Sequence, residues 1–345
     1  MSSSTSNALR YTEAELMRDH ERLAPHVVAG RRLHGGFHAD GTYQPPRALV
    51  RERAFDAWST ALRDRGGDVF PAEASLLTGE RLPNAEQQRV LLRNGLDRMF
   101  FDSLTIVGKI EARGRLLADV SFPDLQPAIV DDISEMAIGH LGRGLLVAHG
   151  LDEGGELESE VGAHDAMWFI ARDLVFDEGA HPDADPPDNI ARPEAGRRIM
   201  PELAPEIEGL VSLLANLLII EFRAEIGFAD TQAILRTADL FTDRREAAEL
   251  AAEIVERIRT DEAIHVRSLC LYLGELCSVE FKTLDGGTIA GRTLIDRFWD
   301  GLVQWATVEQ PALSVARIRP AYEAYIATHP DADRVQAAFD AAGVV

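Results

Sequence analysis

Apolar residues at helical spacing are the feature that most constrains the fold of this chain. They recur at every third or fourth position through four long segments, 127–149, 164–181, 206–240 and 243–278. Such spacing places them on one face of a helix, which must be buried against a neighbour. Region 182–205 holds six of the sixteen prolines and is expected to be a crossover loop. The sequence therefore predicts an all-α fold built on a four-helix bundle.

Shorter helices are expected on both sides of this bundle. Their predicted ranges are 11–23, 46–64, 84–116, 293–306, 313–328 and 331–342. Thr12 and Glu15 are placed as a capping box at the start of the first of them. The run Asp285-Gly286-Gly287, inside 279–292, is the one hairpin signal.

The stretch 33–46 is expected to be a loop, with His34 and His38 as turn residues rather than metal ligands. The expected units are a disordered tail over 1–10, N-terminal helices over 11–126 that pack on the bundle, the bundle itself over 127–278, and a helical extension over 279–345.

The charge balance excludes two classes of partner. The chain carries 35 Lys and Arg against 57 Asp and Glu, a formal charge of −22, which repels phosphate backbones and anionic bilayers. Its longest nearly apolar run, 210–220, is about half the ~20 residues that a membrane helix needs. Cys270 and Cys277 are seven residues apart, about two helical turns, which is too far for a disulfide. We therefore expect a cytoplasmic protein that binds neither nucleic acid nor membrane.

Two of the four segments share the pattern Asp-Glu-x-x-His, at 177–181 and 261–265. A Glu and a His three residues apart share one face of a helix, so both can reach one metal ion. Ten His and 29 Glu in 345 residues give about 0.8 Glu-x-x-His pairs by chance, so the context has to decide.

Burial is the first context. Glu221 shares a helix stripe with Leu214, Leu218 and Phe228, in the most apolar helix of the chain. An unpaired ionised carboxylate there costs several kcal/mol, so it must be protonated, paired or bound to metal. Glu262 has an equally apolar face.

Spacing about the turns is the second context. Residues equidistant from the turn of an antiparallel helix pair are level with each other, which aligns Glu135 with Glu178 and Glu221 with Glu262. In the first helix Asp131, Asp132 and His140 compete with Glu135 as the ligand. The candidate catalytic and metal-binding residues are Glu135, Glu178, His181, Glu221, Glu262 and His265.

At these residues the sequence resembles the ferritin-like di-iron carboxylate proteins, whose four antiparallel helices carry Glu, Glu-x-x-His, Glu and Glu-x-x-His around one long crossover. Both motifs keep the Asp that bacterial multicomponent monooxygenases and related oxidases have before the Glu, while Ala180 and Ile264 stand where Arg is common. The resemblance implies that Asp177 and Asp261 accept hydrogen bonds from the ligating His side chains. His140 is a candidate extra ligand. The level ligands are 41 and 43 residues apart, longer than is usual in the superfamily, so the chain is expected to be a divergent member.

This ligand set suits two iron ions, with a Mn/Fe pair as the alternative. The expected function is a non-haem di-iron oxygenase or oxidase that uses O₂ to oxidise a small organic substrate by hydroxylation, N-oxygenation or desaturation. Such an enzyme needs an electron donor, which the sequence does not identify, and the resemblance also implies a homodimer. The alternatives are an iron-storage protein without organic substrate and a metal-free helical interaction protein with solvated acidic faces.

Overall fold

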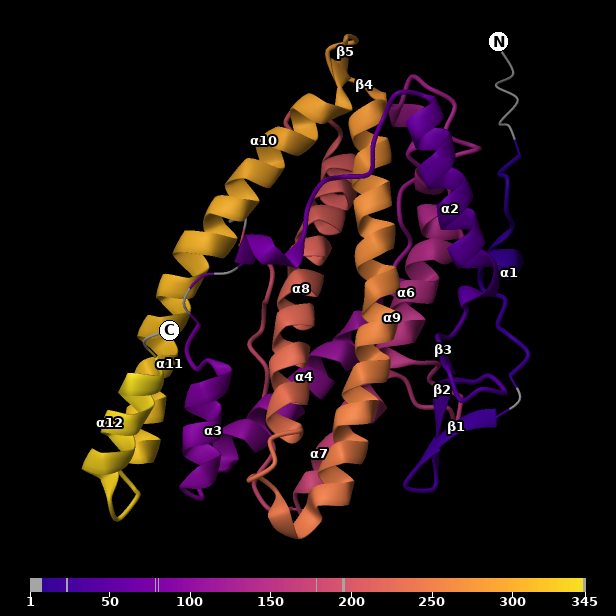
Figure 1. The fold of residues 1–345 in the computed structure, drawn as a ribbon. Coiled ribbons are helices and arrows are strands. Elements are labelled where there is room, and N and C mark those ends of the chain that lie inside the picture. The colour runs from indigo at the N-terminus through magenta and orange to yellow at the C-terminus, as the bar shows by residue number, and fades with distance from the viewer. Residues whose placement is uncertain are drawn as a thin grey trace.

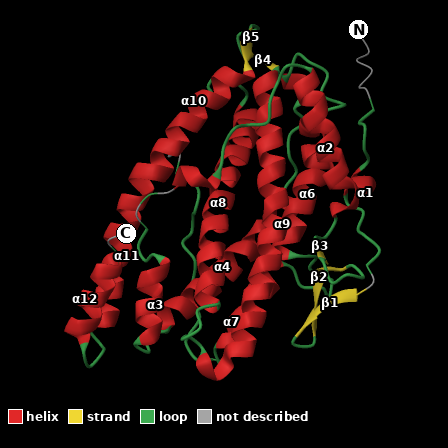
Figure 2. Cartoon of the chain, viewed as in Figure 1, coloured by secondary structure: helices red, strands yellow, loops and turns green. Residues whose placement is uncertain are grey.

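The computed structural model describes residues 8–22, 24–77, 79, 81–177, 179–193 and 196–343. These residues are mostly helical, as the sequence predicts, and strands occur only at two edges (Figure 2). Residues 1–7 of the expected disordered tail lie outside the described residues. No helix within the described ranges is long and apolar enough to cross a membrane.

Two long antiparallel helices form the centre of the molecule (Figure 1). Helix α8, Pro205–Leu235, begins with a proline, whose fixed φ suits the first turn of a helix. Helix α9, Arg245–Ser278, packs along it after a turn in which Phe241 has φ +51°. Both helices agree with the predicted segments to within five residues at each end.

Three further helices pack against this pair and against one another. Helix α4, Arg98–Gly114, lies against α7, His164–Val175, and against α6, Leu146–Gly154, while α7 also packs on α9. α4 comes from the region before residue 127, where the sequence places helices outside the bundle. The helices that surround the core therefore draw on both predicted units.

Glycines explain two differences between the predicted and observed helices. The predicted helix over 84–116 is two helices, α3 (Ala85–Arg93) and α4, because Gly95 has φ +69°. The predicted helix over 127–149 is also wrong, since non-helical backbone over 129–136 and then a 3₁₀ turn and a π turn precede α6, which begins only at Leu146. Gly144, with φ +115°, interrupts the helical backbone just before α6.

The small sheet near the N-terminus corrects the expectation of a loop over 33–46. Strands β1 (Ala24–Val28), β2 (Arg31–Phe37) and β3 (Tyr43–Gln44) form it in the order β1-β2-β3. The predicted hairpin is confirmed as β4 (Glu280–Lys282) and β5 (Thr288–Ala290).

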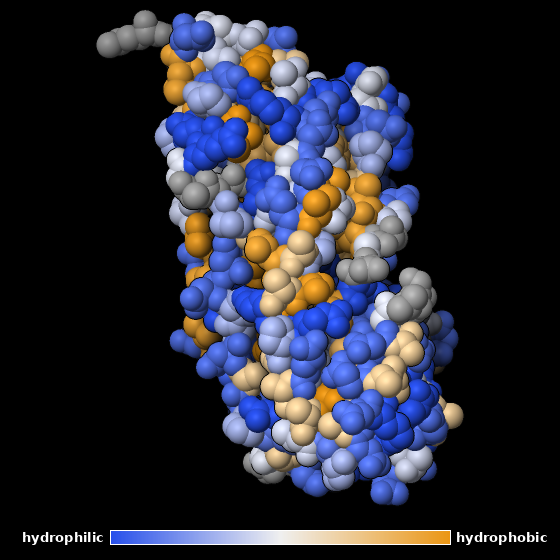
Figure 3. Space-filling model, turned by 90° about the vertical axis from the view of Figure 1, so that its left-hand side faces the viewer, coloured by the Kyte–Doolittle hydropathy of each residue, from blue (hydrophilic) through white to orange (hydrophobic). Residues whose placement is uncertain are grey.

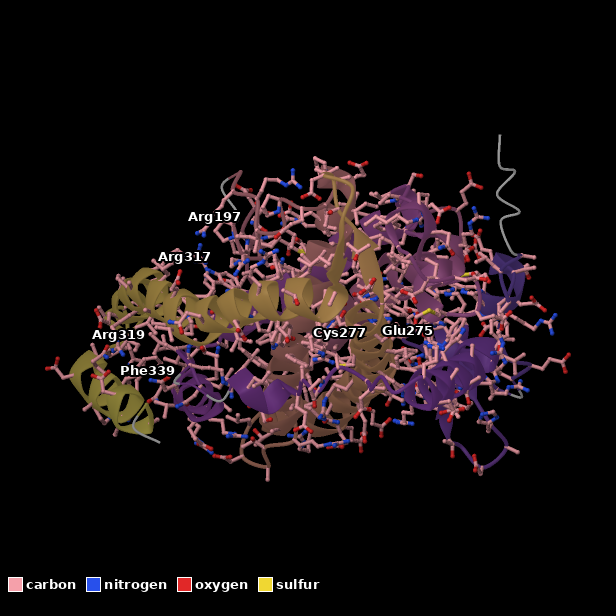
Figure 4. All side chains as sticks on the ribbon, turned by 90° about the horizontal axis from the view of Figure 1, so that it is seen from above. Arg197, Glu275, Cys277, Arg317, Arg319 and Phe339 are labelled. Carbon is pink, nitrogen blue, oxygen red and sulfur yellow. The ribbon has the colours of Figure 1, made fainter. Side chains whose placement is uncertain are left out.

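The remaining helices cover the two sides of the core. The capping box of Thr12 and Glu15 is present, but its helix is only four residues long. Seen from above, α10 (Gly291–Gln304) and α11 (Gln310–Ile326) lead away from Glu275 and Cys277 on α9, and Arg319 and Phe339 lie at the far end (Figure 4). The other elements are α1 (Glu13–Leu16), α2 (Ala48–Asp64), η1 (Ala74–Leu77), α5 (Leu116–Asp119), η2 (Gln126–Ala128), η3 (Ala137–His140), η4 (Leu141–Leu145), η5 (Thr242–Arg244), η6 (Trp305–Glu309) and α12 (Ala332–Ala342).

Candidate metal centre

Helices α8 and α9 bring together three of the six predicted ligands. Nδ1 of His265 lies 2.7 Å from Oε2 of Glu262, one turn earlier on α9, and 3.9 Å from Oε1 of Glu221 on α8. All three side chains are at least 94% buried. The spacing about the turn at 241–242 therefore predicts their proximity correctly.

Helix α6 adds two ligand candidates that the sequence analysis does not select. His149 and Glu153 are four residues apart and share one face of the helix. Nε2 of His149 lies 3.0 Å from Glu221 and 3.4 Å from Glu153. The ring of His149 stacks on that of His265 with 3.8 Å between centroids.

Helices α7 and α4 complete the group. His164 is the first residue of α7, and its Nδ1 lies 3.1 Å from Glu262, 3.5 Å from Glu111 of α4 and 3.8 Å from Glu153. This Nδ1 and Oε2 of Glu111 are buried and make no hydrogen bond. We call the seven side chains the carboxylate–histidine cluster: Glu111, His149, Glu153, His164, Glu221, Glu262 and His265.

The cluster divides into two overlapping groups that could each hold a metal ion. The ligand atoms of His149, Glu153, Glu221 and His265 lie within 4.8 Å of one another, and so do those of Glu111, Glu153, His164 and Glu262. Glu153 belongs to both, with Oε1 facing His265 and Oε2 facing His164. Glu262 also has one oxygen toward each of these rings. Two carboxylates thus lie between two sets of imidazoles and could bridge two ions.

Two aspartates lie behind the histidines, on the ring nitrogens that face away from the carboxylates. Asp152 lies 3.4 Å from Nε2 of His265, and Asp261 lies 3.2 Å from Nε2 of His164. A carboxylate in this position fixes the orientation of an imidazole and raises its basicity as a ligand. The resemblance implies that Asp261 accepts a hydrogen bond from His265, the His of its own motif. In the structure Asp261 faces His164 instead.

Each aspartate is itself held in place. Arg47 and Arg51 contact Asp152 at 2.8 and 2.7 Å. Burial alone would raise the pKa of Asp152, but these two guanidinium groups hold it well below its ordinary value. The hydroxyl of Tyr43 donates to Asp261 at 3.0 Å, and His34 lies 3.2 Å from the same oxygen. The β-sheet therefore positions His34 and Tyr43 beside the cluster.

The carboxylates of the cluster have unequal proton affinities. Burial, and then the charge of Glu262, raises the pKa of Glu221 to about 8. Burial and the neighbouring Glu153 raise the pKa of Glu111 well above its usual range. Burial also acts to raise the pKa of Glu153, but hydrogen bonds from Glu111 and the histidines hold it well below that range. The crowded acids are thus stable together only when some of them carry protons or share a cation.

The histidines show the complementary effect. Burial opposes a charge on His164 and His265, but Glu262 and the other surrounding carboxylates raise the pKa of both rings well above the ordinary value. Protons on these rings balance the carboxylate charge in the absence of metal. Divalent ions would replace these protons, as metal binding at such sites does.

Three predicted ligands are elsewhere or undescribed. Glu135 lies outside any helix, its side chain 68% exposed and 3.7 Å from Arg10. His181 lies 3.0 Å from Asp97, because α7 ends at Val175 and the described residues of the motif, 177 and 179–181, are not helical. Glu178 lies outside the described residues.

The remaining candidates for the first helix also have other contacts. Asp131 accepts from the Glu280 amide at 3.0 Å, and Asp132 accepts from the Ser134 amide at 3.0 Å. His140 is buried between the Met136 carbonyl, 2.7 Å away, and the Tyr11 amide, 3.1 Å away. Asp177 pairs with Arg244 on the surface.

The four residues that sequence reasoning missed carried a readable signal. His149 is the one ionisable residue in the apolar stretch 145–151. Glu153 follows it at the i, i+4 spacing of a shared ligand face. Glu111 follows Leu104 and Val107 on one helical stripe. His164 gave no such pattern, because it stands at the first position of its helix.

A cavity of about 240 Å³ lies beside the cluster. Five cluster side chains line it, together with mostly apolar residues of α4, α5 and α8. The cluster members are Glu111, His149, Glu153, Glu221 and Glu262. A small organic molecule in this cavity would contact the carboxylates directly.

Comparison of the chain with protein-family models, curated proteins and solved structures found no match. The assignment of function therefore depends on the geometry of the cluster.

Proposed function

We propose that the carboxylate–histidine cluster binds two metal ions and that the protein is an O₂-dependent oxidoreductase of a small organic substrate. The observation that carries the proposal is the position of Glu153 and Glu262, each with one oxygen toward His164 and the other toward His265. His149, His265 and Glu221 would complete one ion's ligands. His164 and Glu111 would complete the other's.

Charge and ligand type support this reading. Four carboxylates supply four negative charges, which two divalent ions balance. A mixed set of carboxylate and imidazole ligands suits iron or manganese, and the buried pair of cysteines lies outside the cluster. We propose a Fe/Fe pair, with Mn/Fe as the alternative. We also propose that the helices around it form a divergent ferritin-like bundle, in which α6 carries His-x-x-x-Glu in place of Glu-x-x-His.

Two iron ions, when bound, would supply the reduction of O₂ and the oxidising power for the substrate. The residues of this chain would bind the ions and position the ligands and the substrate. Asp152 and Asp261 orient two imidazoles, and the apolar walls of the 240 Å³ cavity exclude water and hold the substrate beside the carboxylates. The reaction requires an electron donor.

O₂ consumption by the iron-loaded protein tests the proposed function. Protein loaded with Fe(II) without oxygen should consume O₂ repeatedly when a reductant is supplied, and Glu262→Gln should abolish this. Glu256→Gln, a substitution of an exposed residue on the same helix, is the matched control. Uptake that stops after one oxidation of the bound iron would instead indicate storage, and no uptake at all would contradict both functions.

A further inference from the structure

Two further cavities continue the one beside the cluster. A cavity of about 380 Å³ shares Ile110, Glu111, Ile190, Ile220 and Ala224 with it as walls. An outer cavity of about 260 Å³, lined partly by η6 and α11, shares Arg81, Pro83, Arg223 and Gly227 with the middle one. The three cavities therefore adjoin in sequence, from the cluster to the face that carries α11. Figure 3 shows apolar side chains at mid-height on this face, among hydrophilic ones.

One turn of α8 separates the cluster from the outer cavity. At 100° per residue, Glu221 and Arg223 lie on nearly opposite sides of the helix, and Ile220 and Ala224 lie between them. Glu221 belongs to the cluster, Ile220 and Ala224 line the inner two cavities, and Arg223 lines the outer two. A molecule in the middle cavity would thus have the carboxylate of Glu111 at one end and the guanidinium of Arg223 at the other.

Arg223 has unused hydrogen-bonding capacity. Its Nη1 donates to the Ile190 carbonyl at 3.1 Å and its guanidinium carbon lies 4.8 Å from the centre of the Trp305 ring. Its Nη2 is buried without a hydrogen-bond partner, and no carboxylate of the described residues lies within 4 Å of it. The nearby Asp230 pairs with Arg81 instead, at 2.7 Å. A partly buried guanidinium without an acid favours an anionic ligand.

The walls between these two ends are mainly apolar. The middle cavity is lined by Phe100, Val107, Ile220, Phe228 and Ile234 among others. Its charged lining residues are Glu111, Arg223 and the paired Arg81 and Asp230. Apolar walls with a few charged groups are typical of sites for amphipathic small molecules.

We propose that the substrate is a long-chain carboxylic acid, with its carboxylate at Arg223 and its alkyl chain in the middle cavity, directed toward Glu111. This substrate class rests on the proposed function of the cluster. Arg223 is then a binding and specificity residue, separate from the metal ligands.

Calorimetric binding of dodecanoate and of dodecan-1-ol tests this assignment, with metal content measured on the same samples. The wild type should bind dodecanoate more tightly. Arg223→Gln should weaken the binding of dodecanoate by about tenfold or more and leave the affinity for dodecan-1-ol within about twofold of the wild type, because only the charge-assisted hydrogen bonds are lost. Arg223→Lys, which keeps the charge, should bind dodecanoate with an affinity between those of the wild type and Arg223→Gln. Arg297→Gln, which removes a surface pair with Glu202, is the matched control and should bind as the wild type does.

Several outcomes would overturn the assignment. If Arg223→Gln and Arg223→Lys weakened the binding of dodecanoate and dodecan-1-ol equally, Arg223 would only support the cavity wall. Two metal ions per chain without dodecanoate binding would refute the substrate class and leave the proposed function standing. Dodecanoate binding by a chain that takes up no metal would refute the proposed function, and the acid would then not be a substrate.

Discussion

Asp261 is the residue whose contacts connect the sheet to the proposed metal centre. Its buried carboxylate faces His164, His34 and the hydroxyl of Tyr43. Burial would raise its pKa, but the hydrogen bonds from His164 and His34 outweigh burial and lower it, so Asp261 is ionised behind the ligand.

Replacing Asp261 by Asn should weaken metal binding by about ten- to a hundredfold, since the neutral amide no longer enhances the basicity of His164. A Mn(II) titration against a chelator measures this. Asp173→Asn on the exposed face of α7 is the control. Unchanged affinity in Asp261→Asn would contradict the role given to this aspartate.

Glu275 provides a residue-scale test that does not depend on metal. It is fully buried on α9, where its Oε2 accepts from the Ile138 amide at 3.0 Å, and burial raises its pKa to about 7. The folded state therefore holds a proton that the unfolded chain releases near pH 4.5. Its contribution to stability is complete below pH 4.5 and is lost as the pH rises through 7.

Glu275→Gln should remove this pH dependence, because the amide cannot ionise. Relative to the wild type, the variant should gain on the order of 1–3 kcal/mol in free energy of unfolding between pH 5 and pH 8. Urea denaturation at the two pH values measures the difference. A constant difference across this range would show that Glu275 is ionised in the folded protein at pH 5.

The residues that sequence reasoning located share one property. Glu221, Glu262 and His265 lie on two long uninterrupted helices joined by a short turn, so counting residues from the turn places them level. The same count fails for Glu135, which lies outside any helix, and the Glu-x-x-His pattern fails for His181, because α7 ends at Val175. Burial of an acid was thus a better guide to the cluster than the Glu-x-x-His pattern.

At the scale of elements, the short helix α6 depends on the irregular backbone before it. Gly144 has φ +115°, and a Cβ there would lie 3.2 Å from Cβ of Leu16 and 3.3 Å from the backbone of Glu13. This conformation sets the direction from which α6 presents His149 and Glu153. The 3.6-residue spacing of apolar residues continues through 141–151 and does not reveal the interruption.

Gly144→Ala should lower the free energy of unfolding by about 1–3 kcal/mol, because alanine is strained at this φ. It should also reduce metal content, since α6 carries two proposed ligands. Thermal denaturation and metal analysis measure the two effects. Gly209→Ala is the control, an exposed helical position with open space at Cβ that should be neutral or more stable by up to about 1 kcal/mol. Equal effects at both positions would contradict the argument.

For the whole molecule, the charge of −22 has an unusual distribution. Four of its acids are buried in one cluster, where burial raises the pKa of Glu221 to about 8 and carboxylates raise that of His265. A metal ion must displace these protons to bind, so its affinity should rise with pH.

Thermal denaturation with and without Mn(II) at pH 6, 7 and 8 tests this whole-molecule property. The metal-free protein should lose stability as the pH rises toward 8, since folded Glu221 keeps its proton up to about pH 8 whereas the unfolded chain releases it near pH 4.5. The increase in Tm caused by Mn(II) should therefore grow with pH. An increase that is the same at all three values would contradict metal binding within the cluster.

The count of metal ions per chain is the most direct test of the two-metal proposal. Protein loaded with Fe(II) without oxygen and then freed of excess iron should hold about two ions per chain by mass spectrometry. Glu221→Gln should keep about one, because Glu221 belongs to one group of ligands, and Glu153→Gln should keep almost none, because Glu153 belongs to both. The exposed Glu158→Gln should match the wild type. Less than about 0.2 ions per wild-type chain, or a Glu153→Gln variant that binds as much metal as the wild type, would contradict the two-metal proposal.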